Sequence, residues 1–472
     1  MLHFGTTPGT RGKTRLVPML LLVLAVAAFC AMSSCSKTPT GDLPDGSTAS
    51  QQDQPDGDTA AQQDQAEEGQ QDPQSDAVRL DAPQTSDGDP ESPPDGGSGG
   101  GDGPGAGPPT FAEAFPDPNF LQAVLDMPLW KDGREEGGEE SGEDGGEEGN
   151  EDGGEDGGKK GDDVISDEDI AAMANEFVVE ARDMGITDLT GIEYFTKAVI
   201  IDVGGNLLTE LSLPDNAALE RLDCGWNELV KLDLSGNPLL KDLDCRYNQL
   251  AGLDLSANAE LMSLDCRYNQ LAGLDLSGNA ALTMLNCGEN QLGELDLSGN
   301  AALESLYCFS NKLSALDLSN NPTLMILWCG GNRLSSLDTS SNAVLMEFSC
   351  DENQLAWLDV SNNTMLKDFR CFNNQLAWLV VSNNPALEYL SCGDNQLVEL
   401  DLASCAALKY LYCYGNKLAR LDVSKNEDLE RLYCANNMMS SPDDVVGWQE
   451  IGLEVNSPDD PESGSFHLYS PS

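Results

Sequence analysis

A cysteine returns every twenty-one residues through the second half of the chain, and this period constrains the fold more than any other feature. An unbroken period of this length is typical of a repeat architecture, in which each unit buries its apolar face only against its neighbours. We therefore expect a solenoid over residues 198–439. The repeating cysteines are Cys224, Cys245, Cys266, Cys287, Cys308, Cys329, Cys350, Cys371, Cys392, Cys413 and Cys434.

A single repeat indicates how the coil is built. From Leu303 to Leu324 it reads LESLYCFSNKLSALDLSNNPTL. Apolar and outward residues alternate twice, in Leu306-Tyr307-Cys308 and in Leu316-Asp317-Leu318, which is strand periodicity with one face inward. Twenty-one residues cannot also hold a helix of three turns, which would take about eleven. We therefore expect two short strands per coil, stacked in parallel register at roughly 4.8 Å.

The pattern L-x-x-L-x-C-x-x-N-x-L in this unit resembles the signature of leucine-rich repeats. The second half, L-x-x-L-D-L-S-x-N, nearly repeats the first, which is similar to the short bacterial IRREKO-type class. The resemblance implies a β-rich, right-handed leucine-rich-repeat solenoid of parallel coils, with little helix outside a small N-terminal cap. It also implies a bacterial surface protein.

The cysteine column raises the question of a metal site or disulfides, and the spacing argues against both. In-register neighbours hold their Cβ atoms roughly 4.8 Å apart, whereas a disulfide needs about 3.8 Å. Zinc needs four converging ligands, and the histidines are His3 and His467 alone. We interpret the column as buried thiols and expect no metal and no cofactor.

Two asparagine columns, Asn206 to Asn437 and Asn216 to Asn426, fall where the chain turns. An amide can both donate and accept, so we expect both columns to satisfy buried backbone groups. Cys405 replaces asparagine once in the second column.

A column of aspartates follows the second strand. A catalytic acid pair needs two different environments, whereas these residues repeat identically, so we expect them to accept hydrogen bonds from the next turn. Cation binding and hydrolysis are the less favoured readings. The members are Asp233, Asp254, Asp275, Asp296, Asp317, Asp338, Asp359, Asp401 and Asp422.

The N-terminal region predicts export. Arg11, Lys13 and Arg15 precede an apolar run, Leu16 to Ala31, of the length of a secretory signal, so residues 1–34 are expected to be a signal peptide. Met32-Ser33-Ser34-Cys35 resembles a bacterial lipobox, which implies lipidation of Cys35 and, with serine following, an outer-membrane or cell-surface location. Free secretion is the alternative.

Residues 35–110 are rich in Gln, Asp, Pro, Gly and Ser and have few apolar residues, which predicts a disordered tether. Residues 131–163 are an acidic Gly/Glu/Asp insert. These segments carry much of the formal charge of −56, which argues against nucleic acid as a partner.

Both ends of the solenoid should be capped. Residues 111–130 and 164–197 resemble the start of bacterial surface leucine-rich-repeat domains, with Phe115-Pro116-Asp117, Asn119-Phe120 and Ile165-Ser166 in the matching places. The family's calcium loop is not matched, because Gly158 and Lys160 occupy ligand positions and Asp163 the required glycine. We expect a helix from Asp167 to about Phe177 with Ile170, Met173, Ala174 and Phe177 inward. Residues 440–472 should form the C-terminal cap, with Val445, Val446, Trp448, Ile451, Leu453 and Val455 covering the last coil.

Function should depend on what varies between coils. The outward positions beside the first strand are rich in aromatic and arginine residues, which interfaces favour. No Ser-His-Asp set, phosphate loop or HExxH motif occurs, so we expect no catalysis. We predict a monomeric protein that binds a protein or glycan ligand, the alternative being a structural or display element without a ligand. The expected ligand-binding residues are Tyr389, Tyr410, Tyr412, Tyr414, Tyr433, Arg370, Phe372 and Trp328, with Trp357 and Trp378 as the next choice.

Overall fold

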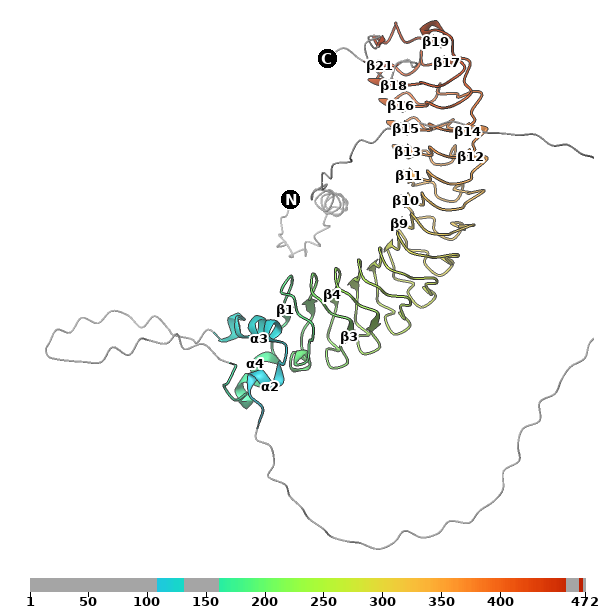
Figure 1. Ribbon diagram of the computed structural model, residues 1–472. Helices are drawn as coiled ribbons and strands as arrows, with labels where there is room; N and C mark the ends of the chain where they lie inside the picture. Colours follow the sequence, from blue (N-terminus) through green and yellow to red (C-terminus); the bar gives the residue numbers. More distant parts are fainter. Residues whose placement is uncertain (1–107, 131–160, 456–466, 470–472) are drawn as a thin grey trace, which may run out of the picture. The chain divides into compact units, whose positions relative to one another are not determined.

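The computed structural model describes residues 108–130, 161–455 and 467–469. Cys35, the signal peptide, and most of the tether and of the acidic insert lie outside these residues. Figure 1 shows the repeat coils stacked one on the next in an arc, after a small helical cap. The leucine-rich-repeat solenoid expected from the sequence is confirmed.

One long sheet of 15 strands lines the inner side of the arc. Its neighbouring strands are parallel and in register through β18, so that Leu306 lies beside Leu327 and Leu327 beside Phe348. The parallel strands are β1 (Val178–Glu180), β2 (Ile200–Asp202), β4 (Arg221–Asp223), β6 (Asp242–Asp244), β7 (Ser263–Asp265), β8 (Met284–Asn286), β9 (Ser305–Tyr307), β10 (Ile326–Trp328), β11 (Glu347–Ser349), β13 (Asp368–Arg370), β15 (Tyr389–Ser391), β16 (Tyr410–Tyr412) and β18 (Arg431–Tyr433).

The second strand position, on the outer side of the arc, differs from expectation. It pairs into ladders in three places among the described residues, whereas the other coils form no strand there. The arc separates the coils more on its outer side than on its inner side, which weakens pairing there (Figure 1). Gly252 and Gly273, in two of the unpaired coils, are also poor strand formers. The ladders are β3 (Glu210–Ser212) with β5 (Lys231–Asp233), β12 (Trp357–Asp359) with β14 (Trp378–Val380), and β17 (Leu421–Asp422) with β19 (Val445–Val446).

The cysteine column lies in the core, as the sequence predicts. The thiol of every coil from Cys224 to Cys434 is buried, and those from Cys224 to Cys413 are free. Burial raises the pKa of each thiol, to about 12 at Cys392. These thiols therefore act as small core hydrophobes.

The first asparagine column bonds as expected. Asn311 donates from Nδ2 to the carbonyl oxygens of Cys287 at 3.0 Å and Cys308 at 3.2 Å. Its Oδ1 accepts from the backbone N–H of Leu292 at 2.9 Å. One amide therefore joins two successive coils.

The second asparagine column donates but mostly does not accept, so half of the expectation for it is wrong. Asn321 donates to the carbonyl oxygens of Leu297 and Asn300, but its buried Oδ1 has no donor among the described residues. The physical reason is that the amide meets carbonyl groups of this turn, which can only accept. Cys405 can replace asparagine there because its Sγ also donates, to Val381 O at 3.4 Å.

The N-terminal cap buries the motif residues Phe115, Phe120 and Ile165. Asp117 Oδ1 caps a helix by accepting from the N–H groups of Asn119 and Phe120, while its Oδ2 accepts from Thr187 of the first coil. This carboxylate fixes the cap to the solenoid. The elements are α2 (Phe111–Ala114), α3 (Pro118–Leu125), η1 (Pro128–Trp130), α4 (Asp167–Met173) and η2 (Ile192–Tyr194).

Helix α4 is shorter than the sequence suggests. It ends at Met173, which is buried, and Ile170 and Phe177, expected inward, are exposed. The chain instead enters β1 at Val178, because pairing with β2 and the β-branched Val178 and Val179 favour a strand.

The C-terminal cap buries Val445 and Leu453, with Trp448 and Ile451 packed against the core. Its elements are η3 (Pro442–Asp444), β19, β20 (Glu454–Val455) and β21 (His467–Tyr469). An arrangement that the sequence did not indicate is that β21 pairs antiparallel with β18. This strand covers the edge of the long sheet, which would otherwise be open to pairing with another chain.

Candidate binding surface

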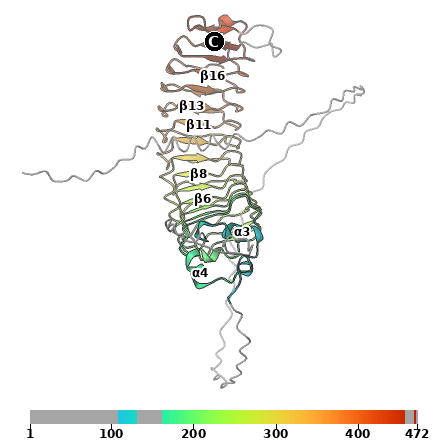
Figure 2. The same cartoon turned by 90° about the vertical axis from the view of Figure 1, so that its left-hand side faces the viewer.

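Two groups of side chains stand out on the inner face, which we define as the outward side of the long sheet together with the turns that follow its strands. Figure 2 shows these strands one above another in a single column. Because the register is strict, residues twenty-one positions apart lie side by side. Sequence variation at these positions therefore becomes a continuous surface pattern.

The tyrosine patch, defined as Tyr389, Tyr410, Tyr412, Tyr414 and Tyr433, lies at the C-terminal end of the inner face. Register pairs Tyr389 with Tyr410 and Tyr412 with Tyr433. The ring of Tyr412 lies 5.4 Å from that of Tyr389 and 4.9 Å from that of Tyr433, the latter pair within 9° of parallel. All five side chains are half-buried, so the patch is ordered and still reachable.

Contacts around the patch restrict its side chains. The Arg370 guanidinium lies 5.0 Å from the ring centre of Tyr389 and is bound in two places by Asp368. The Tyr410 hydroxyl donates to Glu430 Oε2 at 2.9 Å. This acceptor raises the pKa of Tyr410, and burial raises the pKa of Tyr389 despite Arg370. Both phenols are therefore protonated at neutral pH.

Tyr414 lies in the turn after β16 and leans over Gly393 of the preceding coil. A Cβ at Gly393 would come within 2.6 Å of the tyrosine ring. Gly288 and Phe309 repeat this relationship elsewhere on the face. The glycine in one coil thus accommodates the large ring of the next.

The other predicted residues are placed less centrally. Phe372 is half-buried in the turn after β13, in the coil next to that of Tyr389. Trp328 is exposed and contacts Tyr307 edge-on at 5.3 Å. Two strands, β11 and β13, separate it from β15, so Trp328 does not belong to the tyrosine patch.

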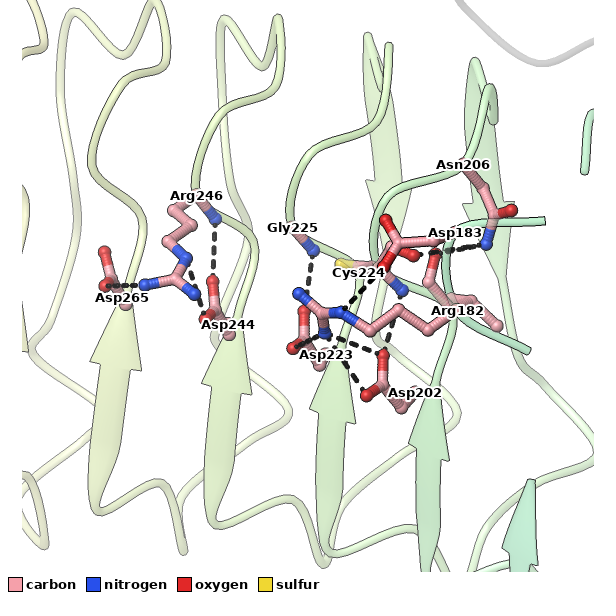
Figure 3. Close-up of polar contacts among 12 residues, drawn as sticks. Arg182, Asp183, Asp202, Asn206, Asp223, Cys224, Gly225, Asp244, Arg246 and Asp265 are labelled. Carbon is pink, nitrogen blue, oxygen red and sulfur yellow. Dashed lines mark hydrogen bonds and ion pairs between the residues drawn. The ribbon is translucent and has the colours of Figure 1, made fainter. Parts of the chain in front are cut away.

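A charged group at the N-terminal end of the inner face was not predicted from the sequence. Figure 3 shows it as an in-register row of Asp202, Asp223, Asp244 and Asp265 with arginines between them. Arg182 Nη1 lies 3.0 Å from Asp202 and 2.5 Å from Asp223. Arg246 lies between Asp244 and Asp265, at 3.2 and 3.9 Å. In the sequence, this row is visible as an aspartate at the last position of the first strand in four successive coils.

Negative charge is in excess in this row. Burial raises the pKa of Asp244 to about 7, with Asp265 and Asp223 adding to the shift and Arg246 opposing it. Burial likewise raises the pKa of Asp265. The row therefore contains one carboxyl, that of Asp244, which resists ionisation up to about neutral pH.

Beside this row stands an aromatic column, defined as Trp226, Tyr247 and Tyr268. Adjacent rings are stacked at 3.7 and 4.2 Å. All three residues have left-handed backbone, with φ of 57°, 52° and 54°. Other coils place Gly205, Ser310 or Gly331 at this position. Aromatic residues were expected at outward positions beside the first strand, but the sequence did not indicate this backbone conformation.

On the outer side, the aspartate column behaves as predicted. Each carboxylate accepts from the N–H two residues ahead, as Asp317 does from Ser319 at 2.9 Å. Hydrogen bonds from the hydroxyl and the N–H of Ser319 lower the pKa of Asp317, and those of Ser277 lower the pKa of Asp275. Trp357 and Trp378 lie side by side in register on this side, with 53% and 62% of their surface exposed.

Over the described residues, no group of three His, Cys, Asp or Glu side chains is arranged to hold a metal ion. In the same part of the chain, no helix combines the length and apolarity needed to cross a membrane.

Comparison with known proteins supports the fold. No protein-family model and no curated protein matches the chain. Among solved structures, the functional domain of InlJ from Listeria monocytogenes, described as including a cysteine ladder, is 25% identical with a TM-score of 0.52, covering 77% of this chain and 92% of that one. The internalin InlF from the same species is 17% identical (TM-score 0.58, 72% and 95% covered). A leucine-rich-repeat protein of Leptospira interrogans is 19% identical (TM-score 0.50, 60% and 83% covered).

Proposed function

We propose that this chain is a cell-surface lipoprotein that binds a protein or glycan ligand through the tyrosine patch, without catalysis. The observation that carries the proposal is the direct contact of Tyr389, Tyr412 and Tyr433 on one face. Stacked repeats commonly bind partners on such extended curved surfaces. Half-buried tyrosines supply rigid contact area with a hydroxyl at its edge, which is typical of interfaces.

The proposed absence of catalysis is supported by the state of the ladder thiols and of the outer aspartates. The ladder thiols are buried with a raised pKa, so they are not nucleophiles. The outer aspartates make the same turn hydrogen bond, and the pKa of Asp275 and of Asp317 is lowered in the same way, so nothing separates these two carboxyls into an acid and a base. Lipidation at Cys35 rests on the lipobox resemblance alone.

The experiment begins with a binding screen of the chain against host matrix proteins, mucins and envelope polysaccharides. For a ligand found there, Tyr412→Ala should weaken binding about tenfold or more, because Tyr412 contacts two other rings of the patch. The melting temperature should fall little, since the ring is half-buried on the surface. Asp275→Asn and Asp296→Asn, on the outer side, are matched controls and should leave affinity unchanged.

A display element without a dedicated ligand is the competing function. It predicts that no ligand is retained in the screen and that tyrosine substitutions have no effect on cell-surface behaviour. A ligand whose affinity is unchanged by both Tyr389→Ala and Tyr412→Ala would refute the assignment of the site to the tyrosine patch.

A further inference from the structure

A hollow of about 540 Å³ lies on the outer side of the arc, away from the tyrosine patch. Its floor includes Ala315 and Ser336, and Trp357 lines it from the next coil. Asp317, Asp338 and Asp359, at the same position of three successive coils, also line it. The hollow therefore combines an exposed aromatic ring with a short row of carboxylates.

The small residues that make the hollow are not needed for folding. The position of Ala315 and Ser336 holds Glu294, Trp378 or Glu399 in other coils of the same backbone path. Gly252 and Gly273 occupy it in two further coils, where neither has a positive φ and an added Cβ would meet no atom within 4 Å. The hollow thus results from the small side chains of Ala315 and Ser336, and the large side chain of Trp357 bounds it in the next coil.

The carboxylates in the hollow lack a positive partner. Each uses Oδ1 to accept from a turn N–H at 2.9 Å, in Ser319, Ser340 and Ser361. Within the described part of the chain, none of the three forms an ion pair, and no lysine or arginine lines the hollow. The turn hydrogen bonds lower the pKa of Asp317 and Asp338, so both are charged at neutral pH.

A basic side chain fits this combination better than a neutral ligand does. Carboxylates in a row attract a cation, and an exposed tryptophan face adds a cation–π contact. The formal charge of −56 would also steer basic partners toward the molecule. A neutral sugar could stack on Trp357 but would leave three like charges uncompensated.

We propose that this hollow binds lysine or arginine side chains of a basic peptide segment on a partner protein, between the aspartate row and Trp357. The site is separate from the tyrosine patch, because it belongs to the second strand position and the patch to the long sheet. Its test is therefore independent of the proposed function.

The experiment uses the full chain and a short Gly-Arg repeat peptide that carries a benzophenone photo-crosslinker. A peptide with citrulline in place of arginine has nearly the same shape without the charge. After irradiation, mass spectrometry locates the crosslinks, which separates the hollow from the acidic insert at residues 131–163. We expect crosslinks between residues 315 and 362, with the arginine peptide favoured about tenfold over citrulline.

Matched variants then test the residues. Trp357→Ala and Asp338→Asn should each lower crosslinking at the hollow about threefold or more, whereas Asp275→Asn, the same turn in a coil outside the hollow, should not. Trp357 and Asp338 are exposed, so both variants should fold, and circular dichroism checks this. Raising the salt concentration should weaken the crosslinking at the hollow.

Three results would overturn the proposal. The first is crosslinking confined to the acidic insert. The second is equal labelling by the citrulline peptide. The third is displacement of the arginine peptide by neutral oligosaccharides at similar concentration, which would make the hollow a glycan site.

Discussion

Asp244→Asn is expected to stabilise the protein at alkaline pH and to change little at acid pH. Asp244 lies in register between Asp223 and Asp265. Asparagine can still accept the hydrogen bond that Asp244 Oδ1 accepts from the Arg246 N–H at 3.2 Å. The fold already tolerates this side chain, because Asn286 occupies the corresponding position two coils further on.

The magnitude follows from the pKa. Burial and the two neighbouring aspartates raise the pKa of Asp244 to about 7 in the folded protein, against about 3.9 in the unfolded chain. The folded state thus holds the proton more tightly, so stability from this group is complete below about pH 4 and is lost as pH rises through about 7. A difference of roughly three pKa units corresponds to about 4 kcal/mol, the upper limit of what Asp244→Asn can restore at pH 8.

The assay is urea denaturation followed by circular dichroism at pH 4 and pH 8. Transition midpoints are compared, since long repeat arrays need not unfold in two states. Asp275→Asn is the control, and its effect on stability should depend on pH in the opposite direction. Hydrogen bonds from Ser277 lower the pKa of Asp275, so this carboxylate stabilises the fold above its unfolded pKa, and the stabilisation is lost as pH falls. If Asp244→Asn instead destabilises equally at both pH values, the ion pair with Arg246 dominates and the reasoning about excess negative charge is refuted.

Two further predictions concern the core and the anchor. Cys308→Asp should lower the free energy of unfolding by several kcal/mol, because it buries an unpaired carboxylate, whereas Cys308→Val should lower it by less than about 1.5 kcal/mol. Equal, small losses for both variants in denaturation experiments would contradict the burial of this column. Cys35→Ala should release the protein from membranes without preventing export, because the predicted signal peptide precedes this residue. Metabolic labelling with a fatty-acid analogue checks this prediction. Label retained in the variant would show that another residue is modified.

The repeated columns were predictable because stacking leaves them little freedom. A residue such as Cys308 must fit between identical neighbours, so its period in the sequence reports burial directly. The same holds for the Asp317 turn bond, which depends only on residues two apart. Features that depend on the curvature of the stack, such as the interrupted second ladder, have no counterpart in a single repeat.

Burial and bonding of individual groups were harder to predict. The path of the turn places carbonyl groups, and no N–H, beside the Asn321 amide, and a single repeat does not indicate this path. The contact of Tyr389 with Tyr412 joins different positions of successive coils, so it depends on side-chain direction as well as on register. Strands β18 and β21, which pair at the C-terminal end of the long sheet, lie more than thirty residues apart in the sequence and share no repeat pattern.

The aromatic column shows a choice of side chain that the turn itself does not require. Every coil turns through left-handed backbone after its first strand, and glycine or asparagine adopts this conformation with little strain, whereas other residues cost roughly 1–2 kcal/mol. Trp226, Tyr247 and Tyr268 adopt it in three successive coils, although Gly205 and Gly331 show that the turn forms without them. Their stacking offsets part of this strain, but Trp226 remains 51% exposed. Glu289 and Glu352 adopt the same backbone without a stacking partner, so the strain is tolerated in this turn and the stacked rings add a contact that a glutamate cannot make.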